Sequence, residues 1–417
     1  MSNTWIELDL EILGANVRSL RRALTPGTEI IFVVKSNAYG HGMIPVAHRA
    51  WECGVEWFAV AHIDEALALR KTLPEVEIVV VGAIDPADAA TAIEHNLIPL
   101  IVDDKHASAL ALSASKTKSR LRCHAKIDTG MGRLGFAWKG AGKLLPVLAR
   151  RKFLDICGIC SHFACVGSSD RSRHKAAPTS ADFADVQFYR FQKVVSACES
   201  AGMKGLFKHT SNSDGILCDS TWNMDGVRPG ILLYGYGARE NGIMTKWNDG
   251  AKGRTRIVSN IPTFQYSNIP TSALPLPFLS WKTRILQIKK VAAGFPVSYD
   301  SIYITKRATN IATIDIGYAD GYHRALSNKG IVLAGGKRCP VVGRVTMNMV
   351  MIDLGTQPCV HERDEVVLIG SQGNESIWAD ELATLAGTIP YEILTSIRTD
   401  ERRIAAEKQL VRRDARY

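Results

Sequence analysis

Residues 30–42 read Ile-Ile-Phe-Val-Val-Lys-Ser-Asn-Ala-Tyr-Gly-His-Gly, and this stretch constrains the fold more than any other. Its first five residues are apolar and mostly β-branched, which predicts a strand buried on both faces. Lys35 ends that strand, and a glycine-bearing loop with Tyr39 and His41 follows. A lysine at the end of a buried strand is costly unless its amine is paired or neutralised. A neutral amine in a protected pocket suits Schiff-base chemistry with an aldehyde, although a lysine at a strand end more commonly extends into solvent.

Strand-like and helix-like segments alternate regularly around this stretch, after an opening strand at Trp5–Leu8 and an amphipathic helix. Helical stretches such as Ile63–Leu73 and Phe183–Ala201 separate the strands. The eight strand candidates are Ile31–Val34, Trp57–Ala61, Ile78–Val81, Pro99–Val102, Arg122–Ile127, Ile156–His162, Leu206–His209 and Asp225–Arg228. This alternation predicts an α/β domain of the (β/α)8 barrel type over residues 1–240. A doubly wound sheet is the alternative, but no G-x-G-x-x-G motif opens its first unit.

The character of the sequence changes near residue 240, and the length of 417 residues suits two domains. Residues 240–275 are rich in Gly, Asn, Ser, Pro and Thr, which predicts a long loop or linker. Short alternating segments follow, with one helix at Trp378–Ala386. The strand candidates are Thr283–Lys289, Asn310–Ile314, Val332–Leu333, Cys339–Val345 and Glu365–Ile369. Residues 241–417 are therefore predicted to form a mainly β C-terminal domain.

Composition excludes several classes of protein. No apolar run reaches membrane-spanning length, and no basic region followed by an apolar stretch marks a secretion signal. Nine cysteines without such a signal suggest reduced thiols and a cytoplasmic protein. Cys157 and Cys160 are three apart on a predicted strand and point to opposite faces, so we expect no metal site there. The net charge of +10 is spread over short basic runs without a nucleic-acid recognition motif, and it suits anionic small molecules.

Chemistry-bearing residues follow four of the predicted barrel strands, at the end where such barrels carry their active sites. Lys35 ends the first strand, and Asp128-Thr-Gly-Met-Gly-Arg-Leu-Gly135 follows the fifth. Ser211-Asn-Ser213 follows the seventh strand, and Arg228-Pro-Gly-Ile231 ends the eighth. The last two positions are the usual phosphate site of a barrel, where Ser213 offers a hydroxyl and Gly230 and Ile231 offer backbone N–H groups. Each piece alone is ordinary turn chemistry, but four pieces at four strand ends indicate a site.

The chain resembles the alanine racemases, which depend on pyridoxal phosphate (PLP). The resemblance covers nearly the whole chain except residues 240–275. In the first half it rests on residues 33–42, Phe58–Ala61, Lys126–Gly135, Ser161–Ala164 and Arg228–Ile231. In the second half it rests on Val297–Tyr299, Ile316–Gly321, Gly343–Met347 and Tyr391-Glu392.

This resemblance implies a role for each matched residue. Lys35 would bond covalently to PLP and move the α-proton on one face of the substrate, and Tyr299 would move it on the other. Tyr299 would reach the site from a partner subunit, which implies a homodimer with shared active sites. Arg228 would face the pyridine nitrogen, and His162 would support it. The phosphate would be held by Tyr39, Ser213, Gly230, Ile231 and Tyr391.

The same resemblance places the amino-acid substrate near Arg133, Tyr318 and the backbone of Met347. Lys126 matches a position that is a carbamylated lysine in many members of the family. The implied reaction is racemisation of L-alanine to D-alanine, which supplies D-alanine for cell-wall peptidoglycan.

Several positions depart from the family pattern near the expected substrate entry. Asn348 stands where aspartate is usual, Asp300 where glycine is common, and Pro390 where asparagine is common. A broad-spectrum or serine-acting racemase of the same fold is therefore the nearest alternative. A PLP-dependent decarboxylase and a non-catalytic PLP-binding barrel are further alternatives. The Val-Ser-Tyr block and Arg228 count against the decarboxylase, and the long second half counts against the single barrel.

Overall fold

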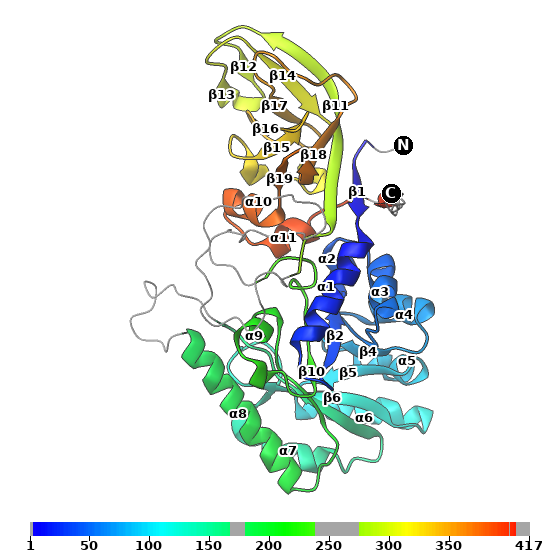
Figure 1. Ribbon diagram of the computed structural model, residues 1–417. Coiled ribbons are helices and arrows are strands. Elements are labelled where there is room, and N and C mark those ends of the chain that lie inside the picture. The colour runs from blue at the N-terminus through cyan, green and yellow to red at the C-terminus, as the bar shows by residue number, and fades with distance from the viewer. Residues whose placement is uncertain (1–2, 167–179, 238–274, 400, 406–417) are drawn as a thin grey trace, which may run out of the picture. The chain divides into compact units, whose positions relative to one another are not determined.

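The computed structural model describes residues 3–166, 180–237, 275–399 and 401–405 (Figure 1). It divides the chain into a barrel unit, Leu13–Pro277, and a β unit made of Met1–Ile12 and Phe278–Tyr417. The predicted linker at residues 240–275 lies outside the described residues apart from its last residue. The structure differs from the predicted domain of residues 1–240 at the N-terminus. Strand β1 (Trp5–Leu8) belongs to the β unit, because it pairs with strands from the second half of the chain.

The barrel unit contains a closed ring of eight parallel strands, as the sequence predicts. Pairing runs in the order β5-β4-β3-β2-β10-β9-β8-β6, and β5 pairs with β6 to close the ring. The strands are β2 (Glu29–Val33), β3 (Trp57–Val60), β4 (Glu77–Val80), β5 (Leu97–Ile101), β6 (Leu121–Asp128), β8 (Leu154–Cys160), β9 (Phe207–His209) and β10 (Gly226–Val227). Most are continuous apolar runs, because helices cover the outer face and side chains fill the interior. The short strand β7 (Phe136–Ala137) adds to β6 outside the ring.

Helices connect the barrel strands (Figure 1). Each carries an apolar face; in α1, for example, Leu13, Val17 and Leu20 are fully buried at helical spacing. These helices are α1 (Leu10–Ala23), α3 (Met43–Glu52), α4 (Ile63–Thr72), α5 (Ala89–Glu94), α6 (Asp104–Thr117), α7 (Trp138–Leu148) and α8 (Ser180–Ser200). Two short segments lie at the carboxyl ends of barrel strands, α2 (Lys35–Tyr39) and α9 (Ser213–Cys218). Both begin at residues that the sequence singles out.

The β unit is built around the long strand β11 (Leu279–Val291), which pairs with β1, β14 and β18. The other strands are β12 (Pro296–Val297), β13 (Tyr303–Ile304), β14 (Thr309–Ile314), β15 (Ile331–Ala334), β16 (Lys337–Pro340), β17 (Val350–Asp353), β18 (Glu365–Gln372), β19 (Glu375–Ile377) and β20 (Arg402–Ile404). Helix α10 (Ala379–Ala386) corresponds to the helix predicted at Trp378–Ala386. Helix α11 (Pro390–Thr395) was not predicted. In the parts of the chain that are described, no helix is both long and apolar enough to cross a membrane.

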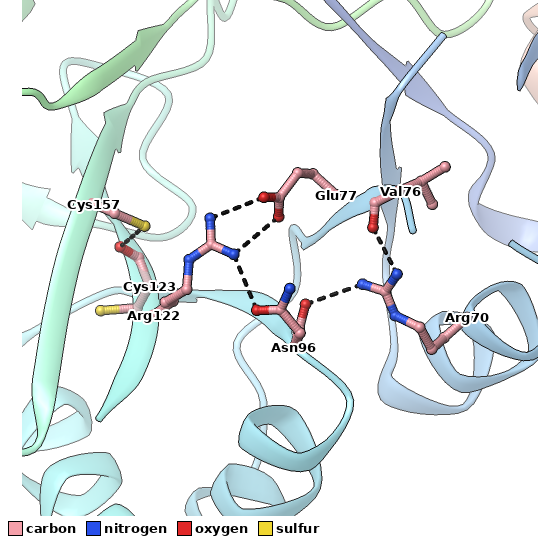
Figure 2. A network of polar contacts seen from close by, with 7 residues as sticks. All are labelled: Arg70, Val76, Glu77, Asn96, Arg122, Cys123 and Cys157. Atoms are coloured by element: carbon pink, nitrogen blue, oxygen red, sulfur yellow. Dashed lines mark hydrogen bonds and ion pairs between the residues drawn. The ribbon is translucent and has the colours of Figure 1, made fainter. Parts of the chain in front are cut away.

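Arg122 ties three parallel strands together near the amino ends of β4, β5 and β6 (Figure 2). Its guanidinium donates to both carboxylate oxygens of Glu77, at 3.1 and 3.2 Å, and to Asn96 Oδ1 at 3.0 Å. Arg70, at the end of α4, donates to the Asn96 carbonyl at 3.1 Å and to the Val76 carbonyl at 2.7 Å. Residues at this end of a barrel stabilise the fold, whereas the opposite end carries chemistry.

Replacing Arg122 with alanine is therefore expected to lower the free energy of unfolding by about 1 kcal/mol, because the bidentate pair is partly exposed and screened by solvent. Denaturant unfolding of both proteins measures this difference. Arg150→Ala is the control, because Arg150 is exposed, and its effect should stay below about 0.5 kcal/mol. Equal losses in the two variants would contradict a stabilising role for the Arg122 network.

Candidate active site

Lys35 begins a segment with an unusual backbone. Residues 36–39 all have φ between 51 and 54°, the left-handed region that non-glycine residues rarely adopt in succession. Two side chains secure this segment: Glu65 Oε1 accepts the Ser36 N–H at 2.5 Å, and Asn37 Oδ1 accepts the Met43 N–H at 2.9 Å. Strain of this kind persists only where the surroundings hold it, and it concentrates at functional sites.

The amine of Lys35 lies in a half-buried position where the protonated form is disfavoured. Burial lowers the pKa of Lys35, and the nearby guanidinium of Arg133 lowers it further, whereas Glu65 opposes both effects. Glu65 is held at the end of β3, where its Oε2 accepts the Ala61 N–H at 2.8 Å. The neutral amine expected from the sequence is therefore favoured by this environment.

Arg228 follows β10 and is only 6% exposed, yet all of its protein partners are neutral. Nη1 donates to the Nδ1 atom and carbonyl of His209, at 2.5 and 2.8 Å. Nη2 donates to the carbonyls of Ser161 and Thr210, at 2.5 and 2.9 Å, with His162 Nδ1 at 3.5 Å. Within the described ranges, Nε forms no hydrogen bond, so this N–H is available to an acceptor on a bound molecule.

Cations surround His162 and Lys126. Burial lowers the pKa of His162 well below its usual range, and Lys126 and Arg228 lower it further. Lys126 is 8% exposed on β6, and burial lowers its pKa to about 8, opposed by Cys160 and assisted by Arg228 and Arg133. No carboxylate pairs with Lys126 in the described parts of the chain. This end of the barrel therefore favours anions and neutral amines.

Ser213, Gly230, Ile231 and Tyr39 lie together, as the phosphate-site prediction requires. Ser213 Oγ accepts the N–H groups of Gly230 and Leu232, at 3.1 and 3.2 Å. A Cβ at position 230 would lie 2.6 Å from the Tyr39 hydroxyl, so only glycine allows that close approach. Ser211 follows β9, as Ser213 does, and its Oγ is buried without a hydrogen-bond partner in the described structure. This place fits a phosphate group, because it offers backbone N–H groups, hydroxyls and the space beside Gly230 that a side chain would fill.

The loop that carries Arg133 is shaped by Asp128. Its Oδ1 accepts the N–H groups of Gly130 and Gly132, at 2.9 and 3.1 Å. Gly135 has φ of 126°, and a Cβ there would lie 2.7 Å from the Asp128 nitrogen. Arg133 is exposed and lies close enough to lower the pKa of both Lys35 and Lys126. The structure thus brings Lys35, Lys126, Arg133, His162 and Arg228 into one electrostatic neighbourhood.

Tyr299, Tyr318, Met347 and Tyr391 belong to the β unit. Tyr299 is 70% exposed in a turn between β12 and β13. Two loops of the unit are joined by backbone bonds, from the Tyr318 N–H to the Thr346 carbonyl and from the Ala319 N–H to the Met347 carbonyl, both 3.0 Å. Gly317 is required at this junction, because a Cβ there would overlap the Met347 carbonyl. Tyr391 lies in α11, which begins at Pro390.

The departures from the family pattern have different structural contexts. Asp300 has φ of 59°, a conformation that glycine adopts without strain, and its Oδ2 accepts from Arg344 Nε at 2.8 Å. Pro390 occupies the first turn of α11, where a missing N–H costs nothing. Asn348 is exposed in the turn between Thr346 and Met349. Nothing in the structure explains the choice of asparagine at 348.

Sequence reasoning missed two groups at the barrel site. Glu65 holds the lysine segment, and its spacing after His62 at the start of a helix is a capping pattern that marks the position. His209 supports Arg228 more closely than His162 does, at 2.5 against 3.5 Å. The signal available in the sequence was the position of His209 at the end of a predicted strand. A metal site is not indicated, because no group of three or more potential ligands occurs in the described structure.

Comparison with known proteins agrees with this arrangement. Residues 8–238 match the family model described as "Alanine racemase, N-terminal domain", and residues 278–405 match "Alanine racemase, C-terminal domain". Alanine racemase of Carboxydothermus hydrogenoformans is 37% identical over 399 residues, covering 95% of this chain and 98% of that protein. Alanine racemase of Syntrophobacter fumaroxidans is 36% identical over 397 residues, covering 95% and 96%.

Solved structures show the same relationship. The alanine racemase of Bacillus anthracis with bound L-Ala-P has a TM-score of 0.80 and 33% identity, and the match covers 99% of this chain and 97% of that one. The alanine racemase of Bartonella henselae with covalently bound pyridoxal phosphate has a TM-score of 0.77 and 27% identity, covering 97% and 100%.

The buried amine of Lys126 predicts a pH-dependent stability. Because its pKa is about 8 when folded and 10.5 in the reference state, the unfolded chain binds more protons between these values. In CO2-free buffer, the free energy of unfolding should therefore rise from pH 8 to pH 10.5, relative to Lys126→Met, by on the order of 3 kcal/mol. Denaturant unfolding across this range measures the difference. Parallel pH curves for the two proteins would contradict a buried, unpaired amine.

The backbone at Asp300 makes a second prediction. Asp300→Gly should change the free energy of unfolding by less than about 1 kcal/mol, because relief of the left-handed conformation offsets the lost contact with Arg344. Asp300→Ala loses that contact but keeps the strained left-handed backbone, so it should be less stable than Asp300→Gly by about 1 kcal/mol. Thermal and denaturant unfolding compare the pair. Equal stability of the two variants would show that position 300 does not require the left-handed region.

Proposed function

The chain belongs to the alanine racemase family, and on that premise we propose that it interconverts L- and D-alanine with PLP, using Lys35 and Tyr299 as the two bases. The observation that carries the proposal is the group of basic side chains at the carboxyl end of the barrel. There, Lys35 is biased toward its neutral form, and the buried Arg228 follows β10, the strand that pairs with β2 before Lys35; the Ser213–Gly230 cradle lies at the same end of the barrel.

The residues present fit PLP. Tyr39, Ser213, Gly230 and Ile231 would hold its phosphate together with Tyr391, and the fit rests on the glycine-dependent approach of the Tyr39 hydroxyl. Arg228 would direct its Nε–H, which has no partner among the described residues, at the pyridine nitrogen, with His162 alongside. When bound, PLP supplies an aldehyde that bonds to an amine and a ring that stabilises negative charge at the substrate α-carbon.

Arg228 determines how strongly the ring withdraws electrons. A guanidinium does not give up its proton, so Arg228 would donate a hydrogen bond to the ring nitrogen without protonating it. This limits charge accumulation on the ring and side reactions such as transamination. It also counts against a decarboxylase, in which an acidic partner for the ring nitrogen would be favoured.

Two bases suit a racemase, because the α-proton must leave one face of the substrate and return to the other. Lys35, biased toward a neutral amine, would exchange the proton on one face. Tyr299 is proposed to act on the opposite face from the partner subunit of a homodimer. Its high exposure, shared by the apolar side chains Phe295, Ile304 and Met347 of the same unit, supports a surface that a second copy covers.

Arg133, Tyr318 and Met347 are proposed to bind the amino-acid substrate, with Arg133 attracting its carboxylate. Lys126 is proposed to be carbamylated, because a neutral amine reacts with CO2 and the resulting anion would offset the neighbouring cations. Bicarbonate is then expected to abolish the pH-dependent stability that the free amine gives. The proposed physiological role is a cytoplasmic supply of D-alanine for cell-wall peptidoglycan.

A broad-spectrum or serine-acting racemase is the second candidate. It is favoured by Asn348 and Pro390, which depart from the family pattern on the unit that carries Tyr318 and Met347. Both candidates share Lys35 and Tyr299, so substrate range separates them.

The test is α-proton exchange in D2O, followed by NMR and chiral analysis, with L-alanine, L-serine, L-lysine and L-arginine. Exchange and racemisation largely confined to alanine are expected; comparable turnover of the others would move the assignment to the broad-spectrum class. Tyr299→Phe should lower racemisation by at least about 100-fold, because one of the two bases is lost, while cofactor colour persists. Tyr189→Phe, an exposed tyrosine on α8, is the matched control. No exchange with any substrate, despite bound PLP, would overturn the proposal.

A further inference from the structure

Three side chains form a buried chain of hydrogen bonds inside the barrel. Arg228 Nη1 lies 2.5 Å from His209 Nδ1, and His209 Nε2 lies 2.9 Å from His124 Nδ1. His209 ends β9, and His124 lies in the middle of β6; both are 0% exposed. His124 takes no part in the site described above, and these hydrogen bonds link it to Arg228 through the imidazole of His209.

The direction of this chain follows from the chemistry of its members. A guanidinium only donates, so His209 Nδ1 must be the unprotonated acceptor. A neutral His209 then carries its proton on Nε2 and donates it to His124 Nδ1. Both imidazoles are neutral at pH 7: burial lowers the pKa of His124 to about 3, and burial and Arg228 lower that of His209 well below its usual range. The proton of His124 therefore lies on its own Nε2.

The Nε2–H of His124 makes histidine a destabilising residue at position 124. His124 Nε2 is buried and has no partner within the described structure, which costs stability. The ring stacks near Trp57 and Phe207, with centroids 6.3 and 6.0 Å away, so an apolar aromatic ring would pack there without the penalty. Room for the imidazole depends on Gly158 on β8, because a Cβ there would overlap it. Packing alone does not account for an imidazole at this position.

We propose that His124 is a positioning residue: by accepting the Nε2–H of His209, it holds that imidazole so that Nδ1 faces and orients the guanidinium of Arg228. The inference rests on the proposed function, in which Arg228 meets the pyridine nitrogen of PLP. Carbonyls of Ser161, His209 and Thr210 accept hydrogen bonds from the two Nη atoms. The imidazole adds the one side-chain acceptor at 2.5 Å, and a free His209 ring would lose that alignment.

The test compares His124→Phe, which keeps an aromatic ring but removes the acceptor, with His124→Asn, whose Oδ1 replaces Nδ1 as acceptor. NMR of holoenzyme labelled with 15N in histidine and arginine reads the bonds directly. The parent should show a solvent-protected His209 Nε2–H coupled to His124 Nδ1 and a sharp Arg228 Nη–H signal. In His124→Phe the Arg228 signal should broaden, and PLP affinity measured by equilibrium dialysis should fall about tenfold, which corresponds to about 1.4 kcal/mol. His124→Asn should recover both.

Other outcomes overturn the proposal. A proton on His209 Nδ1 in the parent would reverse the donor and acceptor roles in these hydrogen bonds. Unchanged Arg228 signals and PLP affinity in His124→Phe would show that His124 is only a packing residue. Equal losses in both variants, with lowered melting temperatures, would indicate a structural role alone. If His124→Phe does not fold, the parent spectrum and His124→Asn still decide. Because these measurements do not involve turnover, failure of racemisation with the expected spectra would reject the proposed function and leave the positioning role standing.

Discussion

The buried charge of Arg228 is the constraint on which the barrel site depends. A cation at 6% exposure, without a carboxylate partner among the described residues, must be stabilised by neutral acceptors, and carbonyls and imidazoles at the ends of β8 and β9 supply them. In the described structure, dipoles of neutral groups therefore supply the hydrogen bonds that stabilise its charge. Burial lowers the pKa of Lys126, His162 and His209, and the positive charge of Arg228 lowers each of them further. A site of this kind attracts a molecule that brings negative charge, and a phosphorylated cofactor and an amino-acid carboxylate both do so.

The sequence predicted the barrel because its signals are local. Buried parallel strands are continuous apolar runs, and the chemistry-bearing residues follow them directly along the chain, as Lys35 and Arg228 show. Several barrel residues of the candidate site could therefore be named from the sequence, although the roles proposed for Lys126 and Tyr299 came from the family resemblance and not from residue type. Strand β1 was assigned to the wrong unit because pairing with β11 joins residues far apart in the chain, which no local pattern reveals.

The features that sequence did not reveal depend on register and backbone conformation. His124 and His209 are 85 residues apart and meet because β6 and β9 both flank β8 in the ring. The left-handed segment after Lys35 contains no glycine at its four positions, so nothing in its composition marks it. Helix α11 was not predicted; it is only six residues long and begins at Pro390, a residue that is well tolerated in the first turn of a helix.

The residues of the proposed site lie in two kinds of structure in this chain. The cofactor-facing groups of the barrel are held by buried contacts with few degrees of freedom, such as the Arg228 cage and the Gly230 cradle. The residues that depart from the family, Asp300 and Asn348, lie in exposed turns of the β unit, where a side chain changes without disturbing a core. The proposed proton transfer would use both kinds of structure, because Lys35 follows a buried barrel strand whereas Tyr299 lies in an exposed turn of the β unit. The proposed substrate range would depend on exposed turn positions such as Asn348, so the proposed barrel chemistry is compatible with more than one choice of amino acid.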